Sequence, residues 1–470
     1  DDPTIVGFSH THFNGTGHSD LGDFLVMPTV GPLRLNPGTA TDPGSGFRSR
    51  YSHATEVAEP DYYRVDLSDY HIRAELTATT RVGFHQYTFP ASDEAHVILD
   101  MMAGIYNYPD KNVWTYVRVV NDTLVEGYRQ TSGWARNRVL YFAMVFNKPF
   151  MDYGMHNFSA PEPYHGFWGK FDQERNFPVM AGRQLRIYFN FRTSEDEKIK
   201  IKFALSPVSM DGALKNLHAE APDWDFEAVK KAGQKAWNEE LHKVEIASRD
   251  SATKINFYTA LYHAFINPTV YMDADSLYQG LDRQVHRATG FVNYTTFSLW
   301  FTFRALHPLF NILQTRRNED MVQSMLAHFR QSAFHMLPVW SNSANENWCM
   351  IGYHSVSVIA DALIKDSVNF DRDAALDACV TTATNRWYEG LGAYIDKGYV
   401  PQEKSGSSVS QTLEYAYDDW AIAQLAKKLG KTDIYRTFMK RSENYRNVFD
   451  PSTGFMRPRM SDGTFMKDFD

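Results

Sequence analysis

The sequence predicts a multidomain protein in which an antiparallel β-sandwich precedes an α-helical domain. A chain of 470 residues is longer than one hydrophobic core usually supports. Short strand-like runs recur between about residues 60 and 205, whereas helical patterns follow one another from about residue 250. We therefore expect a sandwich domain over residues 1–206, a helical linker over 207–249 and a helical domain over 250–470.

The sandwich is predicted from eight runs that alternate in polarity or are rich in β-branched and aromatic residues. Gly, Pro, Asn and Asp turns separate them, and no helical pattern intervenes. Consecutive strands without crossover helices pair in antiparallel fashion. The runs cover residues 62–67, 72–89, 95–102, 113–120, 123–131, 138–146, 184–191 and 198–206.

The linker and the second domain are predicted to be helical throughout. Beyond Pro207 the pattern has helical periodicity, and Asp225 suits a helix N-cap. Several later helices carry apolar or small residues on nearly every face, which is typical of helices packed in two concentric layers. The expected helices cover residues 251–266, 297–314, 319–334, 352–366, 371–390, 408–430 and 432–449.

Composition narrows the classes of partner. The net charge is -8 with Lys and Arg dispersed, which argues against a nucleic-acid partner. The sequence contains no run of about 18 apolar residues, so no membrane span is predicted. Aromatic residues make up 14% of the chain; they either fill large cores or stack on the apolar faces of sugars. Cys349 and Cys379 are expected to be free thiols.

Six stretches in chain order resemble glycoside hydrolase family 92. They are residues 13–23, 52–63, 294–309, 349–365, 408–430 and 441–459, among them "FNGTGHSDLGD" and "SVSQTLEYAYDDWAIAQLAKKLG". The resemblance implies an N-terminal β-sandwich joined by helices to an (α/α)6 barrel, incomplete in this chain. It implies a bacterial, calcium-dependent, inverting exo-α-mannosidase that acts on mannose-containing glycans such as mannan or N-glycans, with α-1,2 linkages as the expected target.

The resemblance also carries expectations about location and completeness. Inversion needs two carboxyl groups about 6.5–9.5 Å apart. The family's acid lies in a Tyr-Thr-Glu-Gly-Asn motif and its base in an Asn-Asp-Asp-x-Gly-Gln-Met motif, and neither string occurs here. We therefore expect the catalytic acid and base beyond Asp470, with no catalytic residue or metal ligand assigned in this chain, and a need for the rest of the barrel. We expect an exported protein in the periplasm or at the cell surface, and an oligomer is possible.

One position departs from the family pattern. Where the family has Trp-Asp-Thr, with the Asp bonded to mannose hydroxyls, this chain has "LWFTFR" with Phe301. Phenylalanine accepts no hydrogen bond, and an unpaired buried sugar hydroxyl costs about 1–3 kcal/mol. The substitution is expected to weaken mannose binding.

Seven residues are predicted to contact the sugar, each with a core or loop-ordering role as the alternative. For Glu346 that alternative is a loop-ordering hydrogen bond. The set is Asn14, Trp300, Phe301, Arg304, Trp340, Glu346 and Trp348.

Other polar residues receive structural interpretations. Glu414 and Asp418 lie one helical turn apart, on one side of any substrate, so they are predicted to tie barrel helices together with Asp419. His354 is predicted to be a core histidine. The acidic run 273–282 lacks the closing Glu and central Gly of an EF-hand, and its Asp282 is expected to order a loop.

Residues 9–31 contain His10, His12 and His18. Their spacing suits neither zinc nor a phosphate loop. We expect a tight turn at 14–17, held by Asp20 and Asp23, to form one wall of the active site, where His12 or Asn14 contacts sugar.

Two alternatives to an active mannosidase stay open. Phe301 and the missing carboxylate motifs are compatible with a catalytically inactive carbohydrate-binding relative. Another (α/α)6 glycosidase or a phosphorylase is the third possibility, although no basic phosphate clamp stands out in the loops.

Overall fold

The structure is a computed structural model that describes residues 2–12, 20–159, 170–171, 175–366, 370–467 and 469. The chain forms two compact units. The first comprises Asp1–Asn267 with Met272–Leu277, and the second comprises Pro268–Tyr271 with Tyr278–Asp470. The helices of the expected linker belong to the first unit, and the domain limits at 206 and 249 stay predictions.

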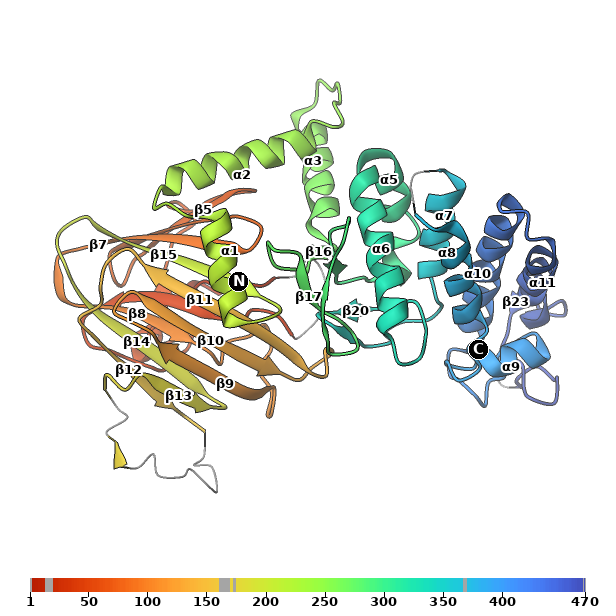
Figure 1. Ribbon diagram of the computed structural model, residues 1–470, viewed down its shortest axis with the longest axis horizontal. Helices are drawn as coiled ribbons and strands as arrows, with labels where there is room; N and C mark the ends of the chain where they lie inside the picture. Colours follow the sequence, from red (N-terminus) through yellow and green to blue (C-terminus); the bar gives the residue numbers. More distant parts are fainter. Residues whose placement is uncertain are drawn as a thin grey trace. The chain divides into compact units, whose positions relative to one another are not determined.

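Two antiparallel sheets form the body of the first unit (Figure 1). In the described residues the larger sheet has the order β13-β9-β10-β11-β15-β7-β6-β5-β4, and the smaller has the order β12-β14-β8-β2. The larger sheet contains β4 (Val57–Glu59), β5 (Tyr62–Leu67), β6 (Ile72–Ala78), β7 (Val82–Phe89), β9 (Asn112–Val119), β10 (Leu124–Thr131), β11 (Arg138–Phe146), β13 (Val179–Gly182) and β15 (Glu197–Ser206). The smaller contains β2 (Leu25–Val30), β8 (Ser92–Asp100), β12 (Asp152–Asn157) and β14 (Leu185–Thr193).

The predicted sandwich is confirmed. Each of the eight predicted runs contains a strand, and the run over 72–89 contains two, β6 and β7. Its core lies between the sheets, where Phe142 and Phe203 of the larger sheet stack at 5.0 Å and Phe24 contacts both rings. Strand β2 is not among the predicted runs, because Pro28 interrupts its pattern. Proline is tolerated there since β2 is an edge strand.

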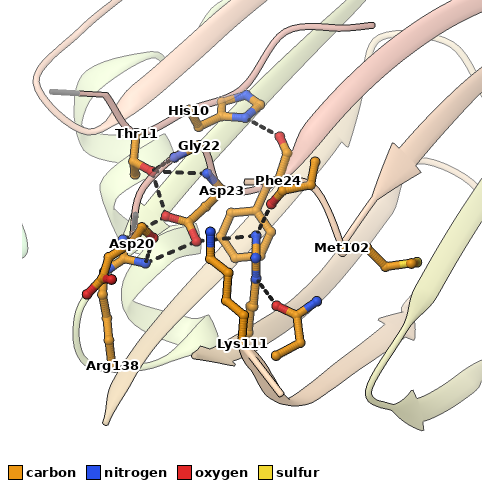
Figure 2. Close-up of polar contacts among 12 residues, drawn as sticks. His10, Thr11, Asp20, Gly22, Asp23, Phe24, Met102, Lys111 and Arg138 are labelled. Atoms are coloured by element: carbon orange, nitrogen blue, oxygen red, sulfur yellow. Dashed lines mark hydrogen bonds and ion pairs between the residues drawn. The ribbon is translucent and has the colours of Figure 1, made fainter. Parts of the chain in front are cut away.

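Asp20 and Asp23 bind the N-terminal segment to the sandwich (Figure 2). The turn at 14–17 that they are expected to hold lies outside the described residues, so that role stays a prediction. Asp23 is fully buried, with Oδ1 and Oδ2 3.0 and 2.7 Å from the guanidinium of Arg138 and a further hydrogen bond from Thr11. Burial is the largest single effect and raises the pKa of Asp23, but Arg138, Arg129 and Thr11 together outweigh it and hold the pKa at about 2. Asp20 accepts backbone N–H groups of Trp134 and Ala135. The segment is therefore fixed at Asp20 by backbone groups and at Asp23 by buried charges.

A second polar chain links His10, which is half-buried, to the buried side chains of His85 and Tyr87. His10 Nδ1 lies 2.7 Å from the carbonyl oxygen of Phe24, which can only accept, so this nitrogen carries the hydrogen. In neutral His10 the other nitrogen then accepts from His85 Nε2 at 2.8 Å, and His85 Nδ1 accepts from the Tyr87 hydroxyl at 2.7 Å. Burial lowers the pKa of His10 to about 4 and that of His85 well below its usual value. Both rings are therefore neutral in the folded protein.

Three helices follow the strands in the first unit: α1 (Met210–Glu220), α2 (Phe226–Leu241) and α3 (Ser251–Ile266). Asp225 caps α2 as predicted, accepting the N–H of Ala228 at 3.0 Å. Helix α1 packs against the larger sheet, where its Ala213 and Leu217 join Ala143 and Ala204 in a small core. Small side chains at this contact allow the helix to approach the strands closely.

The second unit is mainly helical, as predicted (Figure 1). The predicted helix over 297–314 is two helices, because Pro308 is compatible only with the first turn of a new helix. Among the described residues no helix is long and apolar enough to cross a membrane. The helices are α4 (Leu299–Thr302), α5 (Leu306–Leu313), α6 (Thr315–Gln331), α7 (Ser355–Ile364), α8 (Arg372–Ala383), α9 (Leu391–Lys397), α10 (Ser408–Lys428) and α11 (Thr432–Ser442).

A buried carboxylate on α10 joins several of these helices. Asp419 accepts hydrogen bonds from the hydroxyls of Tyr353 at 2.9 Å and Tyr394 at 2.8 Å. Arg441 of α11 donates Nε to the same carboxylate at 2.9 Å, and its Nη2 lies 2.9 Å from the other oxygen. Burial raises the pKa of Asp419 to about 7, against the lowering effects of Arg441 and the two hydroxyls. The predicted role of Asp419 in tying helices together is confirmed.

The neutral histidine pair predicts acid-sensitive stability. The unfolded chain binds protons at histidine near pH 6.5, whereas folded His10 binds one only near pH 4, so stability falls as the pH drops from 6.5 towards 4. The expected slope is on the order of 1 kcal/mol per pH unit for each buried histidine. Urea unfolding of His85→Gln should show a smaller slope than wild type, whereas the exposed control His53→Gln keeps it. Equal slopes for wild type and His85→Gln would contradict the neutral-pair assignment.

The Asp419 cluster predicts a large effect of removing its cation. Arg441→Met leaves a buried carboxylate without its counter-charge and should lower the free energy of unfolding by about 3–5 kcal/mol. The exposed pair of Arg386 with Asp396 is the matched control, and Arg386→Met should cost under about 1 kcal/mol. Adding Asp419→Asn to Arg441→Met should recover part of the loss. Urea denaturation measures all three, and similar losses for the two arginine variants would refute the predicted difference.

Candidate functional site

The loop over residues 337–349 is organised by Glu346. Its carboxylate accepts the backbone N–H groups of Val339 at 3.0 Å, Trp340 at 2.8 Å and Trp348 at 3.0 Å. Burial raises the pKa of Glu346, while these N–H groups lower it. The geometry matches the loop-ordering alternative; contact of Glu346 with a sugar stays a prediction.

The same loop has a strained backbone. Ser343 and Ala344 form the two-residue turn between β20 (Ser341–Asn342) and β21 (Asn345–Glu346), with φ of 48° and 57°. Turns of this kind favour Asn-Gly, because both residues need positive φ. Trp348 adds a third residue in the left-handed region at 59°. Such strain, of order 1 kcal/mol or more per residue, gathers at functional sites and persists only where surrounding contacts enforce it.

Trp340 and Trp348 differ in exposure. Trp340 is 2% exposed, and its indole Nε1 donates to Ser298 Oγ at 2.8 Å. Trp348 is half-buried against Phe334 and Tyr388, with ring centroids 5.6 and 5.8 Å apart. Trp340 is therefore a buried support of the loop, and the Trp348 ring is the more accessible of the two.

Trp300, Phe301 and Arg304 form a second group, on α4 and the residues after it. The rings of Trp300 and Phe301 contact each other at 5.1 Å, and Phe301 is 55% exposed. The Arg304 guanidinium lies over the Trp300 ring at 4.9 Å and pairs with Glu414 at 3.0 Å. Arg304 is thus held against an aromatic ring and a carboxylate while half of its side chain stays exposed.

The structure brings the predicted residues into two neighbouring groups. Trp340, Glu346 and Trp348 belong to one loop, while Trp300, Phe301 and Arg304 belong to the other group. The bond from Trp340 to Ser298, directly before α4, connects the groups.

The remaining predicted residues lie elsewhere or have other roles. Asn14 and His18 lie outside the described residues. His12 is within hydrogen-bond distance of Ser9 Oγ, at 2.8 Å. Asp282 pairs with His286 at 2.9 Å, in the hairpin of β17 (Leu277–Gln279) and β18 (Val285–Arg287), which fits its expected loop-ordering role.

Sequence reasoning missed the contribution of Phe303. Its ring stacks on His354 at 4.0 Å with an interplanar angle of 12°, and the Arg304 guanidinium lies 4.7 Å from it. The available signal was the aromatic run "LWFTF", which places three rings within four residues. His354 is buried at 1% exposure, as predicted for a core histidine.

The described residues do not by themselves provide a calcium site. Within the described ranges no group of three or more His, Cys, Asp or Glu side chains is placed to hold a metal ion. In the run 273–282, Asp273 is instead bonded to Ser206 at 2.7 Å and to Asn216 at 2.8 Å. No chemical step is therefore assigned to a metal on these residues.

Known proteins share this architecture. The chain matches the family model of the glycosyl hydrolase family 92 N-terminal domain over residues 1–206 and that of the catalytic domain over residues 212–470. A family GH92 α-mannosidase from Bacteroides thetaiotaomicron is 42% identical, with a TM-score of 0.94 over 100% of this chain and 62% of the mannosidase. The same mannosidase has been solved in complex with mannoimidazole, with a TM-score of 0.93 over 100% of this chain and 60% of that one.

Two more distant proteins are also similar. An inverting GH92 mannosidase from Bacteroides thetaiotaomicron is 29% identical, with a TM-score of 0.83 over 95% of this chain and 58% of that chain. An uncharacterized secreted glycosidase of Arthroderma benhamiae is 24% identical over 98% of this chain and 60% of its own length. The chain thus spans about three fifths of the length of these relatives. Because both family domains match in order along the sandwich and the helical domain, this protein belongs to glycosyl hydrolase family 92.

Proposed function

We propose that the protein is an exo-acting α-mannosidase that releases terminal mannose from mannan or N-glycans. The observation that carries this proposal is the similarity, over the whole chain, to an α-mannosidase solved with mannoimidazole. Membership of the family supports hydrolysis with inversion, in which one carboxyl group protonates the leaving oxygen and another activates water. Neither family motif for these carboxyl groups occurs in the 470 residues, so neither role is assigned here.

The described residues supply binding surface for a sugar. Trp300, Phe301 and Trp348 present rings that are at least partly exposed, and sugars stack their apolar faces on such rings. Arg304 offers N–H donors beside them, with half of its side chain exposed. In this proposal Trp340 and Glu346 hold the loop in shape.

Linkage, cofactor and location are further parts of the proposal. An α-1,2 linkage and a calcium requirement are supported by the family resemblance alone. Export to the periplasm or cell surface is supported by the secreted relative from Arthroderma benhamiae. The second candidate, an inactive carbohydrate-binding relative, is favoured by Phe301, whose exposed ring accepts no hydrogen bond.

The first test is mannose release by the full-length protein. Incubation with α-1,2-mannobiose should release mannose, and proton NMR should show the β-anomer first, because inversion turns an α-linkage into a β-product. EDTA should abolish release and added calcium should restore it. The α-1,3 and α-1,6 isomers, cleaved more slowly if the linkage proposal holds, serve as matched substrates.

The outcomes separate the candidates. Calorimetric binding of mannose without turnover would replace the mannosidase by the inactive binding relative. Turnover that needs inorganic phosphate would indicate a phosphorylase. Turnover that persists in EDTA would overturn the calcium requirement alone.

Phe301 offers a second test. Phe301→Asp places a hydrogen-bond acceptor at a position that is already exposed, so folding should be unaffected. If a mannose hydroxyl faces this position, KM for a mannoside should fall by about tenfold, which corresponds to one recovered hydrogen bond of about 1–2 kcal/mol. Phe301→Leu is the control without an acceptor and should not improve KM. No difference between Asp and Leu would show that position 301 does not face a sugar hydroxyl.

A further inference from the structure

We propose that Glu414 binds substrate by accepting a hydrogen bond from a sugar hydroxyl, and that His354 is a positioning residue for its carboxylate. This inference rests on the proposed function and adds a residue to the sugar-binding set of the second unit. Sequence considerations alone assigned Glu414 a helix-tying role with Asp418 and Asp419. The contacts and the exposure of Glu414 differ from those of these two aspartates.

The Glu414 carboxylate is held by a hydrogen bond at one oxygen and lies beside a buried imidazole at the other. Its Oε1 lies 3.0 Å from Nη2 of Arg304, and its Oε2 lies 3.3 Å from Nε2 of His354. Within the described residues no other donor forms a hydrogen bond to this carboxylate. A carboxylate has about four lone-pair sites, so it retains acceptor capacity for a ligand.

His354 is itself fixed by a buried carboxylate. Its Nδ1 lies 3.0 Å from Oδ1 of Asp418, which also accepts the Ser357 hydroxyl at 2.7 Å. The other Asp418 oxygen accepts the N–H of Tyr353 at 2.9 Å. Phe303 covers the face of the imidazole at 4.0 Å. The ring therefore cannot rotate freely, and Nε2 stays directed at Glu414.

The buried Nε2 of His354 points to a role beyond packing. The side chain is 1% exposed, yet in the described residues Nε2 has no hydrogen-bond partner of good geometry. A buried polar atom left in this state costs free energy, so its presence calls for an explanation other than packing. Nε2 lies 3.3 Å from Oε2 of Glu414, so the fixed imidazole limits the positions that this carboxylate can adopt.

Exposure distinguishes Glu414 from its neighbours on α10. Asp418 and Asp419 are fully buried, whereas the Glu414 side chain is 17% exposed and its partner Arg304 is 50% exposed. Tyr417 lies three positions after Glu414 on α10. Its partly exposed ring contacts the ring of Phe303, with the centroids 5.4 Å apart. An accessible Arg–Glu pair bordered by aromatic rings offers donors, acceptors and stacking surface, which is the combination that recognises a sugar.

The test uses methyl α-mannoside and its four monodeoxy analogues, each lacking one of the 2-, 3-, 4- and 6-hydroxyls. Binding to the full-length protein is measured by calorimetry for wild type and Glu414→Gln. For wild type, the analogue that lacks the contacted hydroxyl should bind at least tenfold more weakly than the parent sugar. In Glu414→Gln that difference should shrink to about threefold or less, while the differences for the other analogues stay as in wild type.

Two further variants separate positioning from general stability. His354→Phe keeps an aromatic ring against Phe303 but removes Nε2, and it should weaken the same single discrimination. Glu443→Gln removes another glutamate that pairs with an arginine, Arg446 at 2.7 Å, and should leave the whole binding profile unchanged. Melting temperatures establish that each variant is folded.

Each outcome decides the inference. A uniform loss across all analogues in Glu414→Gln, or no loss, would overturn substrate contact by Glu414. Loss in Glu414→Gln with an unchanged profile in His354→Phe would overturn the positioning role of His354. If wild type neither binds methyl α-mannoside nor releases mannose, the proposed function fails and this inference falls with it, a result distinct from all the others.

Discussion

Two adjacent buried carboxylates on α10, Asp418 and Asp419, fix the arrangement of the helical unit. Adjacent residues on a helix project about 100° apart, so the two side chains reach different helices, although Tyr353 bonds to both. Asp418 holds the start of α7 through Tyr353, His354 and Ser357. Asp419 holds α9 and α11 through Tyr394 and Arg441. A buried carboxylate without partners would lower the free energy of unfolding. Each of these two is tolerated because hydrogen bonds satisfy both of its oxygens.

The candidate sugar-binding surface depends on this arrangement. Glu414 lies one turn before Asp418 on the same helix, and His354 connects the two carboxylates. In the proposed site Glu414 contacts the ligand, and Asp418 aligns it through His354 without contacting the ligand itself. Arg304, in the segment after α4, pairs with the Glu414 carboxylate. Segments far apart in sequence therefore meet at one accessible group.

The sequence predicted the regular elements well and the site only in part. Strands such as β11 and β15 have patterns that need no tertiary information, whereas the edge strand β2 contains Pro28 and the short helix α9 lies outside the predicted helices. Trp340 and Trp348 were equivalent in sequence, yet one is buried and the other half-buried. The difference arises from Ser298 and Glu346, whose contacts are long-range or depend on left-handed backbone. The spacing of Glu414 and Asp418 on one helix predicts a helix-tying role for Glu414. It contains no information about the distant partner Arg304.

The turn at Ser343 and Ala344 has a consequence for transplanting loops between relatives. It lacks the glycine that would make positive φ easy, so its shape is maintained by the three N–H groups that Glu346 gathers. Strain and compensation lie only two residues apart along the chain. A graft of residues 337–350 would carry both together, whereas a graft that ends before Glu346 would move the turn without the residue that holds it.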